Sequence, residues 1–174
     1  VDGVIITADR RENPFVSRLL HNNVPVVFVG KPELGVKVSY VNSNNEAGGF
    51  IATKHLIERG YKRVGAIVAL HNSAGDDRFT GYKQALKAYG ITYDEQLVAE
   101  ADFSQESGYE AMKQLLKHKP DGMFVWSDLM AVGAQRAIRE AGLRLPDDIG
   151  MVGFDDLPQT VQGDIPLTTI RQPI

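Results

Sequence analysis

The sequence predicts an α/β fold built on parallel strands that alternate with helices. Three observations predict it: short apolar runs rich in β-branched residues, stretches of helical periodicity between most of them, and glycines where those stretches end. The apolar runs predict buried parallel strands at 4–6, 24–29, 64–70, 122–126 and 149–154.

Helices are predicted between these strands. The pattern is clearest in 128–141, where apolar residues recur at i, i+4, i+7 and i+8. Gly60, Gly90 and Gly142 each follow a periodic stretch, at the place where a left-handed residue commonly ends a helix. The other predicted helices are 11–21, 45–59, 78–89 and 105–118.

One connection interrupts the alternation. The strand at 24–29 and a further β-like run at 38–41 are separated only by residues 30–37. A parallel crossover needs about a dozen residues or more, usually with a helix. The segment 38–42 is therefore either an antiparallel edge or a passage from one sheet into another. The second option would divide the chain into two lobes near Val41.

Composition restricts the function classes. The 174 residues are 43% hydrophobic and 24% charged, as in a globular protein, and no apolar run is long enough to span a bilayer. There is no cysteine for a disulfide or a thiolate metal site. The net charge is −3 and the basic residues are scattered, so we expect any DNA-binding surface to lie outside this chain. Strand-like segments at both ends lead us to expect a longer polypeptide.

Polar and aromatic residues follow the predicted strands. Ligands of open parallel sheets bind beyond the carboxyl ends of the strands. Carboxylates there can accept hydrogen bonds from sugar or amine groups, an arginine donates through a rigid fork, and aromatic rings offer flat faces. The candidates are Thr7, Asp9, Lys31, His71, Arg78, Asp102, Phe103, Trp126, Ser127, Asp128, Asp155 and Asp156.

Most of these candidates also have a structural interpretation. Arg78 could be a solvated charge or pair with Asp76, and Ser127 with Asp128 could simply cap the helix that follows. Asp155 could belong to a turn, and the two aromatic residues could be part of the core. Capping and ligand contact can coexist at one residue.

Enzymatic chemistry has little support in the sequence. The four histidines show no metal-ligand spacing, and neither a Gly-x-Ser-x-Gly elbow nor a phosphate-binding glycine loop is present. Asp155 and Asp156 could in principle hydrolyse a glycoside, but adjacent side chains usually point apart. We expect a binding protein without catalytic residues, cofactor or metal.

Several sequence pieces occur together in a known family. They are VDGVII, VPVVFVGKP, VNSNNEAGGFIATKHLIERGYKRVGAI, DRFTGYKQAL, DFSQESGYEAMKQLL, SDLMAVGAQRAIREAGLRLPDDIGMVGFDD and PLTTIRQPI. With these pieces, in this order, the chain resembles the effector-binding domain of LacI/GalR family bacterial transcription regulators over essentially its whole length. The stretch LRLPDDIGMVGFDD followed by PLTTIRQP is the most specific part.

The resemblance implies a two-lobed, periplasmic-binding-protein-like (type I) fold with parallel sheets flanked by helices. Residues 1–42 would form part of the N-terminal lobe, 43–169 the C-terminal lobe and 170–174 a return crossing. The crossings would lie at 41–45 and 168–172. The first elements of the N-terminal lobe, its returning segment and a helix-turn-helix head would lie outside this chain, so apolar surface would be exposed.

The resemblance also implies a ligand site. Arg78 matches the family's effector-contacting arginine, and Asp155 matches its ligand-binding aspartate. Phe103 stands where an aromatic residue packs on the ligand, and Ser127 stands at a position that is often Asn or Gly, beside Asp128.

Three further positions complete this comparison. Thr7 and Lys31 match rim positions of the N-terminal lobe. Asn44 replaces the usual aspartate at the first crossing, which removes a charge there.

The implied partners are a small-molecule effector, operator DNA reached through the helix-turn-helix head, and a second copy in a homodimer, all in the cytoplasm. The sequence GKP after the second predicted strand is similar to the corresponding segment of maltose-operon regulators, which favours a sugar or oligosaccharide as the effector. A periplasmic sugar-binding protein of a transporter and a carbohydrate hydrolase are the alternatives. We expect loss of Arg78 or Asp155 to abolish the effector response and leave folding intact.

Overall fold

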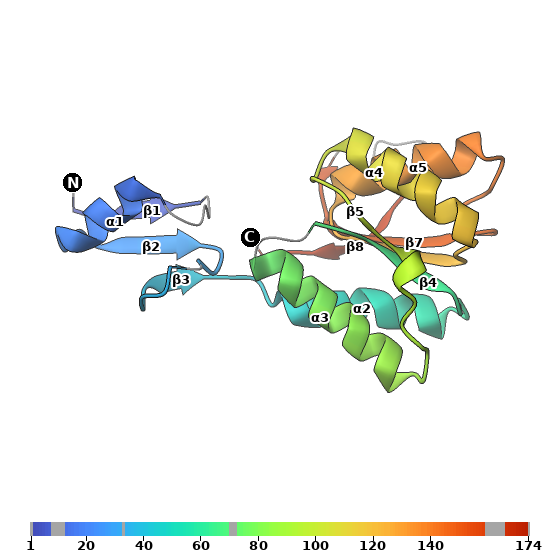
Figure 1. The fold of residues 1–174 in the computed structure, drawn as a ribbon, viewed down its shortest axis with the longest axis horizontal. Helices are drawn as coiled ribbons and strands as arrows, with labels where there is room; N and C mark the ends of the chain where they lie inside the picture. Colours follow the sequence, from blue (N-terminus) through green and yellow to red (C-terminus); the bar gives the residue numbers. More distant parts are fainter. Residues whose placement is uncertain (1, 8–12, 33, 70–72, 159–165, 174) are drawn as a thin grey trace.

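Two separate parallel sheets organise the molecule. The computed structural model describes residues 2–7, 13–32, 34–69, 73–158 and 166–173. Figure 1 shows a three-stranded sheet at one end of the long axis and a larger five-stranded unit at the other. All paired strands are parallel and helices flank both sheets, which confirms the predicted α/β architecture.

The N-terminal lobe is small. Its sheet has the order β1-β2-β3, and the elements are β1 (Val4–Ile6), α1 (Pro14–His21), β2 (Val26–Val29) and β3 (Ser39–Val41). Helix α1 begins at Pro14 because the Asn13 side chain accepts a hydrogen bond from the Phe15 amide. Val16 of this helix packs on Val26 and Phe28 of the sheet.

The opposite face of this sheet is open. Ile5 of β1 and Val27 of β2 alternate with the residues that face α1, and both are exposed. The N-terminal lobe therefore exposes apolar surface, as the sequence led us to expect.

Strand β3 corrects one sequence-based expectation. The antiparallel-edge option is wrong, because β3 pairs with β2 in parallel, with Val27 opposite Ser39. The described residues of the connection form no helix, and its backbone includes Gly30 and Gly35, whose φ values of 98° and 64° are readily adopted by glycine. The chain then continues from β3 into the second unit. The segment therefore passes from one sheet to the other, as the second of the two options predicted.

The C-terminal lobe contains the five-stranded sheet, in the order β5-β4-β6-β7-β8. Helices α2 and α3 pack together on one face, and α4 and α5 on the other (Figure 1). The strands are β4 (Val64–Val68), β5 (Val98–Glu100), β6 (Gly122–Val125), β7 (Gly150–Asp155) and β8 (Thr168–Arg171). The helices are α2 (Asn45–Glu58), α3 (Ser73–Ala88), α4 (Gln105–Leu115) and α5 (Asp128–Glu140), with short 3₁₀ turns η1 (Glu95–Leu97) and η2 (Leu116–His118).

Helices α2 and α3 approach each other closely. A Cβ atom on Gly49 would lie 2.3 Å from the carbonyl oxygen of Arg78, and one on Gly81 would lie 2.0 Å from that of Glu46. Only glycine permits these backbone contacts. They place the start of α2, with Asn45, directly beside Arg78.

Most predicted element positions are confirmed within a few residues. Gly60, Gly90 and Gly142 have φ values of 98°, 69° and 77°, as their predicted place after helices requires. Helix α3 starts earlier than predicted, at Ser73, so Arg78 lies in its second turn. Strand β5 was not among the predicted runs. None of the helices in the described part of the chain has the length and apolar character needed to cross a membrane.

Candidate functional site

A cleft of about 370 Å³ lies between the two lobes. It is bounded by the carboxyl ends of first-sheet strands, by the start of α3, and by the two crossing segments that connect the lobes. Its lining residues are Val29, Gly30, Val41, Asn42, Ser43, Asn45, Ala74, Arg78, Gln172 and Pro173. The cleft thus combines apolar walls with convergent polar groups, the usual character of a small-molecule site.

Arg78 is the cation of this cleft. Its side chain is buried, and its Nε donates to the amide oxygen of Asn45 at 2.9 Å. Nη1 donates to the carbonyl oxygen of Trp126. Burial lowers the pKa of Arg78 to about 10, which the charge of Asp155 partly opposes, so the group stays charged at neutral pH. The interpretation of Arg78 as a solvated surface charge is wrong.

Asp155 faces Arg78 from the end of β7. Its Oδ1 lies 3.9 Å from Nη2 of Arg78 and accepts a hydrogen bond from Nε2 of Gln172 at 2.8 Å. The side chain is 22% exposed, so the carboxylate is still open to a ligand. Burial raises the pKa of Asp155, and the nearby guanidinium opposes that rise.

The backbone at this point is strained. Asp155 and Asp156 have φ values of 119° and 62°, in the region that L-residues seldom adopt. Asp156 also pairs with Arg171. Strand β7 ends at this strained point, with the Asp155 carboxylate beside Arg78, and strain of this kind is common at binding sites.

The two crossing segments are joined by side chains. The Ser43 hydroxyl donates to Oε1 of Gln172 at 2.7 Å, across 129 positions of the sequence. Asn45 donates through Nδ2 to Oδ1 of Asn42 at 3.2 Å. Asn44 caps α2, because its side-chain oxygen accepts a hydrogen bond from the Ala47 backbone amide at 3.0 Å. The aspartate that is usual at this position in the family could cap the helix in the same way.

Ser127 and Asp128 lie behind the rim. Ser127 is buried and caps α5 by accepting from the Met130 amide at 3.3 Å. The Asp128 carboxylate is fully buried and accepts from the Thr169 hydroxyl at 2.6 Å and from the Leu157 amide at 2.9 Å. Burial raises the pKa of Asp128 against these hydrogen bonds. This carboxylate ties α5 to β8 and to the loop that follows Asp155.

Phe103 projects from the carboxyl end of β5. It has a φ of 69° and is 40% exposed. Asp102 Oδ1 accepts from the Ser104 amide at 3.0 Å, and hydrogen bonds with Ser104 and Ser107 lower the pKa of Asp102 to about 2. Asp102 therefore belongs to the turn that holds Phe103 outward. Phe103 does not line the cleft described above, although it follows a strand of the same sheet edge.

The N-terminal lobe candidates are both exposed. Thr7 follows β1, and Lys31 follows β2. The carbonyl oxygen of Lys31 accepts a hydrogen bond from the Ser73 hydroxyl at 2.6 Å, which connects the N-terminal lobe to the start of α3. Two other rim candidates, Asp9 and His71, lie outside the described residues.

Sequence reasoning missed several residues of the cleft as site residues. Asn45, Ser43 and Gln172 carry its hydrogen bonds, and the only signal was their position in the two crossing segments. Trp126 is fully buried in the core, as one interpretation had it, and its indole N–H has no hydrogen-bond partner among the described residues. Within the described ranges no group of three or more potential ligating residues could hold a metal ion.

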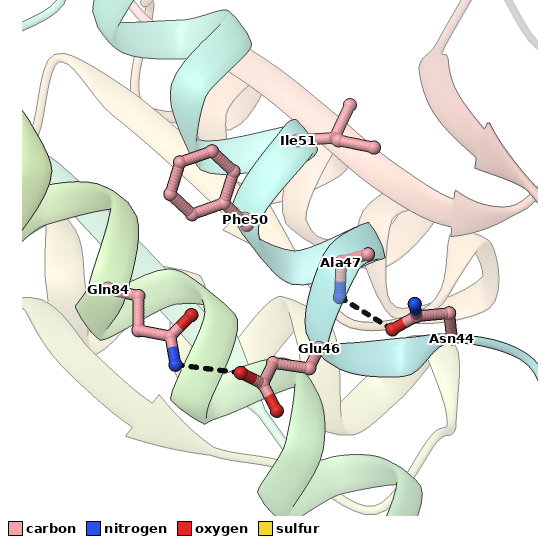
Figure 2. Close-up of a pocket in the computed structure, with 6 residues that line it drawn as sticks. All are labelled: Asn44, Glu46, Ala47, Phe50, Ile51 and Gln84. Atoms are coloured by element: carbon pink, nitrogen blue, oxygen red, sulfur yellow. Dashed lines mark hydrogen bonds between the residues drawn. The ribbon is translucent and has the colours of Figure 1, made fainter.

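A second hollow lies on the outer side of α2 and α3. It has a volume of about 440 Å³, and Figure 2 shows the six residues that line it: Asn44, Glu46, Ala47, Phe50, Ile51 and Gln84. Gln84 and Glu46 face each other there and share a hydrogen bond of 2.7 Å. The hollow contains neither Arg78, which lines the interlobe cleft, nor Asp155, which contacts two lining residues of that cleft, so we place the functional site in the cleft.

Comparison with known proteins points to one group of regulators. Residues 53–174 match the profile of the family described as periplasmic binding protein-like domain. The chain is 41% identical to the HTH-type transcriptional regulator CelR of Thermobifida fusca and 36% identical to the HTH-type transcriptional repressor PurR of Klebsiella pneumoniae. Each alignment covers 99% of this chain and 52% of the relative, so the chain spans about half the length of these relatives.

Solved structures give the same result. The structure of transcriptional regulator CelR in complex with cellobiose matches with a TM-score of 0.93 at 41% identity, over 99% of this chain and 54% of that one. A LacI family regulatory protein from Chloroflexus aggregans matches with a TM-score of 0.92 at 29% identity, over 99% of this chain and 63% of that one. The two-lobed arrangement of this chain is therefore that of LacI family regulators.

Proposed function

Because this chain belongs to the periplasmic binding protein-like domains of the LacI/GalR family, we propose that it is the effector-binding domain of a DNA-binding transcription regulator. The effector, a sugar, occupies the cleft between the lobes. The observation that carries this proposal is the pairing of Arg78, which lines that cleft, with a partly open Asp155 directly beside it.

The chemistry of the cleft suits a neutral polyhydroxylated ligand. A sugar hydroxyl both donates and accepts hydrogen bonds, and Arg78 with Asp155 offers a fork of donors beside an acceptor. Their opposite charges compensate each other, which favours a ligand without net charge. Val29, Val41 and Ala74 provide apolar surface for the C–H face of a sugar ring.

The other predicted site residues take different roles in this proposal. Phe103 packs on the outer part of the sugar, and Thr7 and Lys31 contact it from the N-terminal lobe. Ser127 is buried and caps α5, so we assign it the role of fixing the start of that helix behind the rim. Asp128 holds the loop of Asp155 in place through its buried hydrogen bonds, so its role is positioning.

A disaccharide is the first ligand to test. The relative with 41% identity has been solved with cellobiose, and the overall fold agrees closely with that complex. We propose an oligosaccharide effector of this kind, with cellobiose as the leading candidate.

The sugar acts by shifting the population of lobe arrangements. We place the division between the lobes near residue 42, and the chain leaves the sheet of the C-terminal lobe after β8, at Gln172. A ligand that contacts both lobes binds one arrangement more tightly than the other and so favours it. In a cytoplasmic homodimer, that shift changes the operator affinity of helix-turn-helix heads outside this chain.

The domain has no catalytic role in this proposal. The relatives named above are regulators of transcription, which favours effector binding over hydrolysis of a carbohydrate and over delivery of sugar to a transporter.

Calorimetric titration of the full-length protein with cellobiose, maltose, glucose and ribose tests the proposal. We expect saturable binding of one of these sugars at a single site, which Asp155→Asn abolishes. Asp147→Asn is the matched control, because Asp147 is an exposed carboxylate outside the cleft. Wild-type protein that binds none of the sugars, or an Asp155→Asn variant that binds as tightly as wild type, contradicts it.

A further inference from the structure

A continuous chain of side-chain contacts connects the crossing segments to the charged pair of the cleft. The Ser43 hydroxyl donates to Gln172, and Gln172 donates to Asp155. Asp155 faces Arg78, and Arg78 donates to Asn45. The chain closes on itself, because the amide nitrogen of the Asn45 side chain donates to the carbonyl oxygen of Ser43 at 3.1 Å.

Both crossings take part in this closed chain. Ser43 lies between β3 and α2, in the segment that carries the polypeptide into the C-terminal lobe. Gln172 directly follows β8, in the segment that leaves it. Any change in the relative position of these segments therefore alters the geometry of the Ser43–Gln172 hydrogen bond.

Gln172 also determines how Asp155 meets Arg78. The closest oxygen of Asp155 lies 3.9 Å from Nη2 of Arg78, which is an ion-pair distance but too long for a hydrogen bond. That same oxygen accepts from Gln172 at 2.8 Å. The amide of Gln172 thus holds the carboxylate away from the guanidinium and leaves donor and acceptor groups apart for a ligand.

We propose that Gln172, held by Ser43, is a positioning residue that keeps Asp155 and Arg78 separated and makes that separation depend on the two crossings. When the crossings carry Gln172 away, the carboxylate closes on the guanidinium in a direct charge-assisted hydrogen bond. The effector then has to break this bond in order to bind. Sugar affinity and lobe arrangement are coupled through Gln172, and the coupling is reciprocal. This inference rests on the proposed function.

A double-mutant cycle on the full-length protein tests the inference. Binding of cellobiose, or of the panel sugar that binds most tightly, is measured for Gln172→Ala, Ser43→Ala, the double variant and the control Gln114→Ala. We expect Gln172→Ala to weaken binding about tenfold, in keeping with the loss of one hydrogen bond to a charged group, and Ser43→Ala to weaken it by less. The double variant binds as weakly as Gln172→Ala alone, and Gln114→Ala, at an exposed position of α4 outside the cleft, binds as wild type.

Stability separates positioning from a merely structural role. If Gln172 is a spacer, Gln172→Ala allows a new Arg78–Asp155 hydrogen bond, and the midpoint of urea unfolding stays equal to wild type or rises. A lowered midpoint together with wild-type affinity overturns the inference. Losses of affinity that add in the double variant also overturn it, because they indicate two independent contacts with the sugar.

The result for wild type distinguishes the two proposals. If the wild type binds no sugar, the proposed function fails and the inference fails with it. If the wild type binds sugar and Gln172→Ala binds equally well, only the inference fails.

Discussion

Arg78 stacks on Phe154, with the guanidinium carbon 3.6 Å from the centroid of the ring. The ring is itself confined, because a Cβ atom on Gly48 would lie 2.6 Å from its Cε2 atom. A cation over an aromatic face is stabilised by the ring's charge distribution, most strongly when the pair is buried. Helix α2, strand β7 and helix α3 thus cooperate to hold one guanidinium in a fixed orientation.

Replacement of Arg78 by lysine tests whether sugar binding needs the several N–H donors of the guanidinium group. A lysine keeps the charge but cannot bond to Asn45, to the Trp126 carbonyl and to a ligand at once. We expect sugar affinity to fall by about 30-fold, equivalent to one or two hydrogen bonds to a charged group. Calorimetric titration measures this effect, with the exposed Arg59→Lys as the control.

The same substitution bears on folding. Sequence reasoning led us to expect that Arg78 is dispensable for folding, but its side chain is buried and satisfies two polar groups. We now expect Arg78→Lys to lower the free energy of unfolding by about 1–2 kcal/mol. Unchanged stability and unchanged affinity in this variant would show that Arg78 is peripheral.

The close contact between α2 and α3, at Gly49 and Arg78, can also be tested by substitution. Gly49→Ala introduces a Cβ atom 2.3 Å from the Arg78 carbonyl oxygen, so α3 has to move. We expect a loss of about 3 kcal/mol in unfolding free energy, at the upper end of overpacking effects, together with weaker sugar binding. Gly60→Ala is the control, since nothing lies within 4 Å of a Cβ there and only its positive φ is strained.

Chemical denaturation and titration of both glycine variants provide the measurement. Equal stability of Gly49→Ala and wild type would refute the close packing of α2 on α3. A Gly49→Ala variant that loses little stability but no longer binds sugar would indicate that the added methyl group displaces mainly Arg78.

The sequence predicted the fold better than the contacts within the site. Strand and helix positions follow from apolar periodicity, which each segment carries locally. The parallel pairing of β3 with β2 does not, because two glycines replace the usual helical crossover in that connection. The Ser43–Gln172 hydrogen bond joins residues 129 positions apart and depends on how the two crossings lie together.

Residue type alone also leaves roles undetermined. Asp128 and Asp155 both follow strands at the same sheet edge, and both are acidic. Tertiary packing distinguishes them: a Cβ atom on Gly153 would lie 2.3 Å from Oδ1 of Asp128, which shows how tightly that carboxylate is enclosed. Asp155 has no such enclosure and is partly exposed.

Removal of the Asp128 carboxylate tests its positioning role. Asp128→Ala leaves the Thr169 hydroxyl and the Leu157 amide without their acceptor. We expect the free energy of unfolding to fall by about 3 kcal/mol, the cost of losing two hydrogen bonds to a buried carboxylate. Asp147→Ala removes an exposed ion pair with Arg144 and is expected to change stability by less than about 0.5 kcal/mol. Similar effects of the two substitutions on urea unfolding would argue against the buried role.

Sugar binding is expected to depend on pH through Asp155. Its pKa is raised above the ordinary 3.8 by burial, and the groups around it are Arg78, Asp128, Asp156 and Gln172. The acceptor is present only when the carboxyl group is ionised, so affinity falls as the pH drops through this raised pKa. The sign for stability is opposite, because a carboxyl group with a raised pKa in the folded state contributes less to stability as the pH rises through that window.

Titration calorimetry from neutral pH down into the ordinary carboxyl range measures this dependence. Asp155→Asn is expected to bind weakly at every pH and to show a flat profile. Wild-type affinity that is constant down to the ordinary carboxyl range would contradict the assignment of Asp155 as the acceptor.

A crystal structure of the full-length protein with its bound sugar is the most direct test of the central claim. We expect the sugar in the cleft between the lobes, with one hydroxyl accepting from the Arg78 guanidinium and donating to the Asp155 carboxylate. A sugar bound elsewhere, such as in the hollow on the outer side of α2 and α3, with Arg78 and Asp155 left unliganded, would contradict the account.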